Sequence, residues 1–122
     1  MDLNKLTEKI IGCAIKVHKE LGAGLLESIY ESAMCIEINS SGLKFQRQKL
    51  LPVYYKGYRI GEFRVDLVVE EMILVELKSV ERFDPVFEAQ ILSYMKLGGY
   101  RLGLLINFNS RLLKTGIRRY II

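Results

Sequence analysis

The chain has 122 residues, 50% of them hydrophobic and 26% charged, with a formal net charge of +4. That length fits one domain of ordinary globular composition, which excludes disordered and collagen-like chains. No apolar stretch approaches the roughly 20 residues of a membrane-spanning helix, and no secretory signal opens the chain, so we expect a cytoplasmic protein without membrane contact.

The first third of the chain predicts two helices. Apolar residues recur at spacings of three and four from Leu3 to Leu21, with charged residues between them, which is typical of an amphipathic helix. Gly22-Ala23-Gly24 ends it, and a second helix is expected from about Leu26 to Ser40. Cys13 and Cys35, one on each helix, fit reduced thiols better than a disulfide or a metal site.

The middle of the chain predicts three strands rich in β-branched and aromatic residues. Short breaks at Lys56-Gly57 and Glu70-Glu71 favour antiparallel hairpins between them. Pro52 cannot donate a backbone hydrogen bond, so the first strand should lie at an edge or carry a bulge. The three strands are expected at Leu43 to Tyr55, Tyr58 to Val69 and Met72 to Ser79.

The last third predicts a helix and two further strands. Asp84-Pro85 is a typical helix start, and the helix should run from Pro85 to about Leu97. A buried strand from Arg101 to Asn109 and a last strand from Arg111 to Ile122 follow. The order α-α-β-β-β-α-β-β predicts an α/β fold, a mixed central sheet flanked by helices in two or three layers, in which the third helix crosses over to a parallel strand.

Three charged residues interrupt otherwise apolar strands: Asp66, Glu76 and Lys78. Burial of an unpaired charge is costly, so these groups must be paired, exposed at a strand end or bound to a metal. Glu76 and Lys78 share one face of their strand, and pairing across Glu70-Glu71 sets Asp66 opposite about position 75. The converging groups suit a divalent-cation site for phosphodiester hydrolysis, and a buried ion-pair network without chemistry is the alternative.

Two further segments carry polar groups toward the same region. Glu27 opens the second helix, where it could reach the site or simply favour the helix dipole. Gln90 and Tyr94 lie one turn apart on the third helix and share a face, which would also fit a solvated edge.

Together these motifs resemble the PD-(D/E)XK nuclease superfamily in its RecB-like branch. The series is Asp66, then Glu76-Leu77-Lys78, then Gln90-Ile91-Leu92-Ser93-Tyr94, and the segment from Gly24 through Glu27 to Tyr30 matches the motif of the small GxxExxY proteins. The resemblance implies a restriction-endonuclease-like core over residues 1–122 and a Mg²⁺- or Mn²⁺-dependent nuclease. One departure is Val65, where the superfamily's name has proline.

The resemblance also implies roles for individual residues. Asp66 and Glu76 would be catalytic metal ligands, with the backbone carbonyl of Leu77 and the Glu27 carboxylate as additional ligands. Lys78 would be the catalytic lysine, and Gln90 and Tyr94 would steady the site and the nucleic-acid backbone.

The basic residues are clustered in two segments, which indicates a polyanionic partner, with a solvated basic face as the alternative. Residues 44–64 hold six basic side chains against the single Glu62, and residues 96–122 hold six and no acidic one. The nucleic acid, DNA more readily than RNA, would contact Lys49, Arg64, Lys96 and Arg101 besides Tyr94. The tyrosines at 54, 55 and 58 are expected to pack within the strands, with stacking on bases as the alternative.

Two alternatives stay open at this point. The fold could serve a non-catalytic module that binds nucleic acid or another protein. The last strand, which ends in Arg118-Arg119-Tyr120-Ile121-Ile122, offers an edge through which two copies could form a homodimer.

Overall fold

The computed structural model describes residues 1–122 and has the expected α/β architecture of three α-helices and one five-stranded mixed sheet. In chain order the elements are α1 (Leu3–Leu21), α2 (Glu27–Ser40), β1 (Phe45–Tyr55), β2 (Tyr58–Val69), β3 (Ile73–Lys78), α3 (Pro85–Gly98), β4 (Leu102–Asn107), the 3-10 helix η1 (Leu113–Gly116) and β5 (Ile117–Ile121). No helix combines the length and the apolar character that crossing a bilayer requires.

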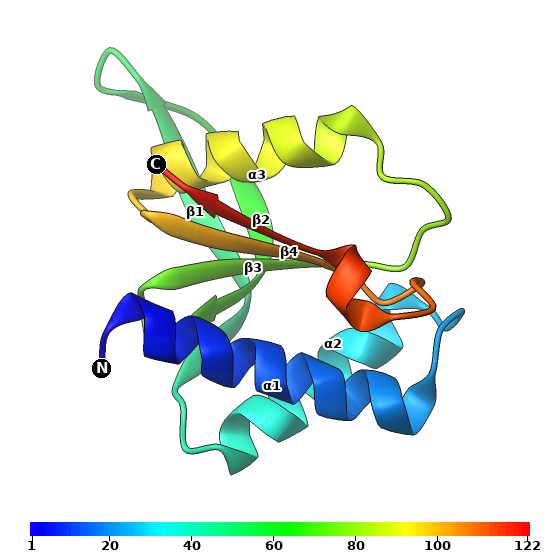
Figure 1. The fold of residues 1–122 in the computed structure, drawn as a ribbon. Coiled ribbons are helices and arrows are strands. Elements are labelled where there is room, and N and C mark those ends of the chain that lie inside the picture. Colours follow the sequence, from blue (N-terminus) through cyan, green and yellow to red (C-terminus); the bar gives the residue numbers. More distant parts are fainter.

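The strands follow one another across the sheet in the order β1-β2-β3-β4-β5. All neighbours are antiparallel except β3 and β4, which α3 connects as parallel strands, as the sequence predicts. Figure 1 shows three layers, with α1 and α2 on one face of the sheet and α3 on the other. Pro52 lies on the edge strand β1, one residue from a register shift between Val53 and Tyr54, so both of its predicted settings are found.

Each face of the sheet has its own apolar core. The core under α1 and α2 contains 19 buried residues, among them Tyr30, Met34 and Phe108. The core under α3 contains only 8, including Ile91 and Met95. Gly103 allows α3 to approach β4 closely, because a Cβ atom there would lie 2.6 Å from the sulfur of Met95.

The alternation of side chains between the two faces of β1 and β2 is interrupted at Gln48 and Asp66. Arg47 pairs with Leu67 and Lys49 with Val65, while the intervening opposite residues, Gln48 and Asp66, form no backbone pair. Gln48 has φ +51°, a left-handed conformation that few non-glycine residues adopt. Residues two apart in a regular strand share a face, yet Val65 packs under α3 and Leu67 under α1 and α2. The bend therefore places Asp66 at the boundary between the two cores.

Two details differ from the sequence-based expectation. Residues 111–116 do not extend the last strand but form a loop and the helix η1, so β5 begins only at Ile117. Tyr54, Tyr55 and Tyr58 do not pack within the strands: they lie at the end of a hairpin that projects beyond the rest of the sheet (Figure 1) and are 59%, 60% and 75% exposed. β5 forms the second edge of the sheet, and pairing of two copies through it stays a prediction.

Candidate active site

The two carboxylates predicted to converge lie opposite each other where β2 and β3 separate. Leu67 pairs with Val75 in the last pair of this ladder, so the register, predicted to within one residue, sets Asp66 opposite Glu76. Beyond that pair the Asp66 side chain takes the place of a strand partner, because its Oδ2 accepts a hydrogen bond of 2.8 Å from the Leu77 backbone N–H. This bond fixes the Asp66 carboxylate beside the backbone of β3.

Glu76 is a buried acid next to a second acid. It is 8% exposed, and burial, followed by the charge and hydrogen bonding of Asp66, raises the pKa of Glu76 to about 9. The nearby Lys78 charge acts in the opposite direction but does not offset these effects. A carboxyl group with such a pKa holds a proton near neutral pH.

Lys78 lies on the same face of β3 as Glu76, as the sequence predicts. Leu74 packs under α3 and Val75 and Leu77 pack under α1 and α2, so the alternation sends residues 74, 76 and 78 toward α3. The Lys78 ammonium lies 4.4 Å from the centroid of the Phe87 ring on α3. This contact holds the lysine on the α3 side at the end of the sheet.

The end of β3 is fixed by a residue outside the sequence motifs, Asn107. Asn107 on β4 pairs with Lys78 and is buried. Its side-chain amide accepts a bond of 3.1 Å from the Val80 N–H and donates one of 2.9 Å to the Val80 carbonyl. The loop after Lys78 is thereby fixed, and the sequence signal for Asn107 was a polar residue at the end of an apolar strand.

Tyr94 lies near the two acids, whereas the Gln90 side chain is exposed to solvent. Burial, and then the charges of Glu76 and Asp66, raise the pKa of Tyr94. Its ring stacks on Phe63 with centroids 4.5 Å apart. Gln90, one turn earlier on α3, is exposed and makes no hydrogen bond with the protein, so its amide is free to bind another molecule.

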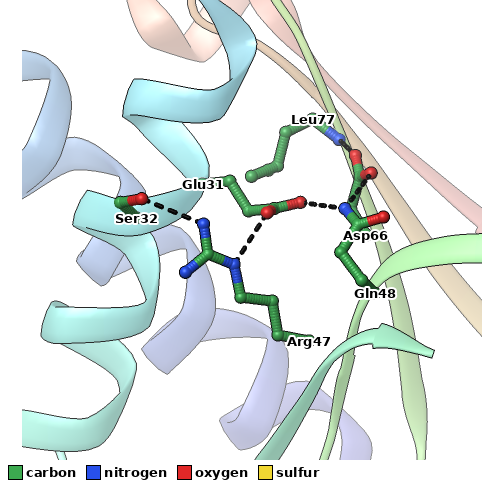
Figure 2. Close-up of polar contacts among 6 residues, drawn as sticks. All are labelled: Glu31, Ser32, Arg47, Gln48, Asp66 and Leu77. Atoms are coloured by element: carbon green, nitrogen blue, oxygen red, sulfur yellow. Dashed lines mark hydrogen bonds and ion pairs between the residues drawn. The ribbon is translucent and has the colours of Figure 1, made fainter.

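A second carboxylate on α2, Glu31, joins the site from the opposite core (Figure 2). It is 8% exposed and accepts a hydrogen bond of 2.8 Å from Arg47 Nε. Gln48 Nε2 donates both to Glu31 Oε1 and, at 3.2 Å, to Asp66 Oδ1. The strained residue Gln48 thus links the helix carboxylate to Asp66. The sequence signal was an acid at helical spacing from Met34 and Ile38, which are buried.

Glu27 lies one helical turn before Glu31, is exposed, and forms neither an ion pair nor a hydrogen bond. It lines an open depression with Ser79 and Val80, at the end of β3. No three His, Cys, Asp or Glu side chains of the structure are grouped so that they could hold a metal ion. The structure therefore brings Asp66 and Glu76 together and leaves Glu27 at the rim, so its role as a ligand stays a prediction.

The predicted nucleic-acid contacts do not share one face of the molecule, since Arg64 alternates with Phe63 and Val65, which pack under α3. Lys49 pairs with Val65, and Arg64, two residues before Asp66, is exposed on β2. Lys96 is exposed near the end of α3. Arg101 precedes β4, which pairs Leu102 with Ile73 and Asn107 with Lys78. Arg101 therefore lies at the end of the sheet away from Lys78, so of the four residues its position gives the least support for a contact near the two acids.

The family model of the PD-(D/E)XK nuclease superfamily matches residues 4–120. The chain belongs to the PD-(D/E)XK nuclease superfamily. Its three helices and mixed five-stranded sheet agree with the restriction-endonuclease-like fold of this superfamily, which supports a nuclease-type function. No curated protein and no solved structure matches the chain.

Nucleases of this superfamily generally use divalent metal ions, and the donor atoms present fit such an ion. Asp66 and Glu76 are hard oxygen donors of the kind that Mg²⁺ and Mn²⁺ prefer. A cation beside the pair would replace the proton that Glu76 holds, because a positive charge favours the ionised carboxyl group. The chemistry of the two acids therefore fits a bound divalent cation.

Proposed function

We propose that this protein is a nuclease that uses Mg²⁺ or Mn²⁺ to hydrolyse phosphodiester bonds. The observation that carries the proposal is the pair of Asp66 and Glu76, in which a buried acid has a pKa of about 9 beside a second acid. A fold without chemistry would be more stable with an apolar residue at position 76. A strongly perturbed pKa with an identified charge partner is typical of functional sites.

The roles of the residues follow from their positions. A bound divalent ion would supply a Lewis acid that polarises the phosphate and lowers the pKa of a bound water. Asp66, Glu76 and the backbone carbonyl of Leu77 would hold that ion, and Glu27 would approach it from α2. Lys78, on the face of Glu76, would orient the attacking water or offset charge on phosphorus.

The remaining roles concern the substrate. Gln90 and Tyr94 would contact the nucleic-acid backbone from α3, and Lys49, Arg64, Lys96 and Arg101 would neutralise phosphates, which predicts salt-sensitive binding. We also propose DNA rather than RNA as the substrate, a cytoplasmic location, and membership of the GxxExxY proteins in the RecB-like branch. These finer assignments rest on the sequence motifs, chiefly Gly24, Glu27 and Tyr30.

The test is cleavage of labelled single-stranded, duplex and branched DNA, and of RNA, in Mg²⁺, Mn²⁺ or EDTA. We expect cleavage only with the metals. Glu76→Gln and Lys78→Met should each lower the rate by at least about 10²-fold, the size of effect seen when one electrostatic stabiliser is removed. Glu8→Gln and Lys19→Met make the same chemical changes on the exposed surface of α1 and should cleave at the wild-type rate.

The outcomes separate an enzyme from a binding protein. Cleavage that survives both Glu76→Gln and Lys78→Met would overturn the assigned site. Binding of nucleic acid without cleavage in any metal would identify a non-catalytic module that keeps the nuclease fold.

A further inference from the structure

Beyond Leu51 and Phe63, which pack under α3, the β1–β2 hairpin has no third strand beside it and its side chains are mostly exposed. β1 and β2 span 11 and 12 residues, whereas β3 spans 6 and pairs only with residues 67–69 of β2. We call residues 49–64 the hairpin arm. Its tip projects beyond the helices in Figure 1. An isolated two-stranded ribbon is only marginally stable in water, and large exposed apolar side chains often mark a binding surface. The arm is therefore a candidate binding surface.

The tip presents two tyrosines together on one face. Tyr55 pairs with Tyr58 across a two-residue turn at Lys56 and Gly57, whose φ values of +48° and +83° are typical of a tight hairpin. Paired residues project to the same face, so the two rings lie side by side. Tyr54 pairs with Arg59 and projects to the opposite face.

The face that carries these two rings continues to the carboxylate pair. Leu51 pairs with Phe63 and packs toward α3, and strand alternation places Tyr55 on the same face as Leu51. Phe63 stacks on Tyr94, whose pKa is raised by its burial and by the charges of the two acids. One face of the hairpin therefore leads from the acids past the Phe63–Tyr94 stack, and then past the Val53–Gly61 pair, to the two tyrosines at the tip.

The two tyrosine rings at the tip have faces that no other aromatic ring covers. The stacked or edge-on aromatic pairs of the structure are Tyr30–Phe108, Phe63–Tyr94 and Phe83–Phe87, and none includes Tyr55 or Tyr58. Tyr55 and Tyr58 are 60% and 75% exposed. The Lys56 ammonium lies over the Tyr55 ring, 5.4 Å from its centroid.

The charge of the arm selects the partner. It carries four basic residues (Lys49, Lys56, Arg59 and Arg64) against the single Glu62, which is bound to Arg59 at 2.9 Å. A second copy of this arm would bring like charges together, whereas a polyanion would be attracted to it. On the face of Tyr55 and Tyr58 the basic side chains are Lys56 and Lys49, and exposed aromatic rings beside basic side chains are the composition that binds unpaired bases.

We propose that the hairpin arm binds an unpaired nucleic-acid strand that leads to the carboxylate pair, with Tyr55 and Tyr58 as the stacking surfaces for its bases. This inference rests on the proposed function and names its substrate class, single-stranded nucleic acid or an unpaired end. A base within a duplex already has both faces covered by its neighbours, so an intact duplex offers nothing for the rings to stack on.

The length of the arm sets a minimum substrate. Tyr58 lies eight residues before Asp66, which is about 26 Å along a strand at roughly 3.3 Å per residue. About eight stacked nucleotides of one strand cover that distance at roughly 3.4 Å each. Substrates much shorter than this cannot contact the tip and the acids at once.

The test is fluorescence anisotropy with labelled strands of about 12 nucleotides, single or paired, in EDTA so that nothing is cleaved. Tyr55→Ala combined with Tyr58→Ala should weaken single-strand binding about 10- to 100-fold, because each base–aromatic stack contributes about tenfold. Tyr54→Ala, with nearly the same exposure on the other face, and the paired Tyr→Phe substitution, which keeps both rings, should stay within about twofold.

Several results would overturn the inference. They are no single-strand binding by the wild type, an equal loss for Tyr54→Ala, an equal loss on the duplex, or a wild-type dimer in sedimentation that the double alanine variant abolishes. The last would assign the arm to contact between copies of the chain.

A cleavage series separates this inference from the proposed function. The double alanine variant should cleave a strand of about 12 nucleotides more slowly than the wild type and one of about 4 at the same rate. If the wild type binds single strands as expected but never cleaves them, the nuclease proposal fails and the proposed binding role of the hairpin arm stands. If it cleaves both lengths with no dependence on the tyrosines, the arm has no such role.

Discussion

Each face of the sheet carries one stacked aromatic pair, and the two pairs share a geometry but not an environment. Tyr30 and Phe108, under α1 and α2, have centroids 4.5 Å apart at an angle of 7°, and both are fully buried. Phe63 and Tyr94, on the α3 face, have centroids 4.5 Å apart at 11°, and both are half-buried. The same contact therefore serves a closed core on one side and an open surface on the other.

The hydroxyl groups show the same division. Tyr30 donates to the Gly22 carbonyl at 2.6 Å and accepts from the Leu25 N–H at 3.1 Å, which fixes the loop between α1 and α2. Tyr94 makes no hydrogen bond within the protein and lies near Glu76 and Asp66. The α1–α2 side of the sheet stabilises the fold, and the α3 side, which has fewer apolar residues, holds the groups free to bind a substrate.

Truncation of one ring from each pair should show the largest difference. Phe108→Ala should lower the free energy of unfolding by about 3–5 kcal/mol, the cost of removing a large buried side chain. Phe63→Ala should cost only about 1–2 kcal/mol, because water already reaches its ring. Urea unfolding measures both values. Equal losses would show that the two faces of the sheet contribute equally to the stability of the fold, which would contradict the difference inferred above.

The next effect concerns Glu76, the buried acid of the α3 face. Burial and the nearby Asp66 raise its pKa to about 9, well above the value of about 4.3 in an unfolded chain. The folded state therefore keeps a proton that the unfolded state releases. The stabilisation from this group is complete below the unfolded pKa and is lost as the pH rises toward the folded pKa.

In EDTA the free energy of unfolding should thus fall between about pH 6 and pH 8, by up to about 1.4 kcal/mol per pH unit. Glu76→Gln, which mimics the protonated acid, should remove this part of the fall. Mn²⁺ should reverse its sign, since the ion binds the ionised pair and stabilises only the folded chain. A wild-type profile parallel to that of Glu76→Gln, with and without Mn²⁺, would contradict the assigned pKa.

Local rules were sufficient to predict the centre of the site. The short break at Glu70-Glu71 fixes how β2 and β3 pair, so the meeting of Asp66 and Glu76 followed from counting residues back from the turn. Strand alternation likewise predicted that Glu76 and Lys78 share a face. The extent of each core could not be derived this way, because it depends on which helix covers which half of a strand.

The parts that the sequence did not reveal depend on contacts between distant segments. Glu31 meets Arg47 and Gln48 only because α2 packs beside β1, and no local pattern encodes that packing. The sequence around Tyr55 and Tyr58 is typical of a strand, and strand side chains are usually covered by a neighbouring element. β1 and β2 are longer than β3, so the side chains at their turn end have no neighbouring element to pack against. Residue propensity predicts the strand, but only the assembled sheet shows which of its residues are buried by other elements.

The link between the two faces, Gln48, should give a smaller effect. Gln48→Ala removes the amide that bridges Glu31 and Asp66 and should cost about 1–2 kcal/mol, because two carboxylates lose a donor. Gln48→Gly loses the same amide but suits the backbone at φ +51°, so it should be more stable than Gln48→Ala by about 1 kcal/mol. Urea unfolding compares the two variants, and equal stability would mean that the left-handed backbone stores no strain.

The smallest effect is expected on the exposed hairpin arm. Arg59 and Glu62 form an ion pair of 2.9 Å, but their side chains are 56% and 49% exposed, so water competes for both charges. A double-mutant cycle with alanine at each position should give a coupling of at most about 0.5 kcal/mol, which salt screens further. A coupling above about 1 kcal/mol would mean that the arm is held rigid by its own side chains. A small value leaves the basic side chains of the arm free to turn toward a phosphate backbone.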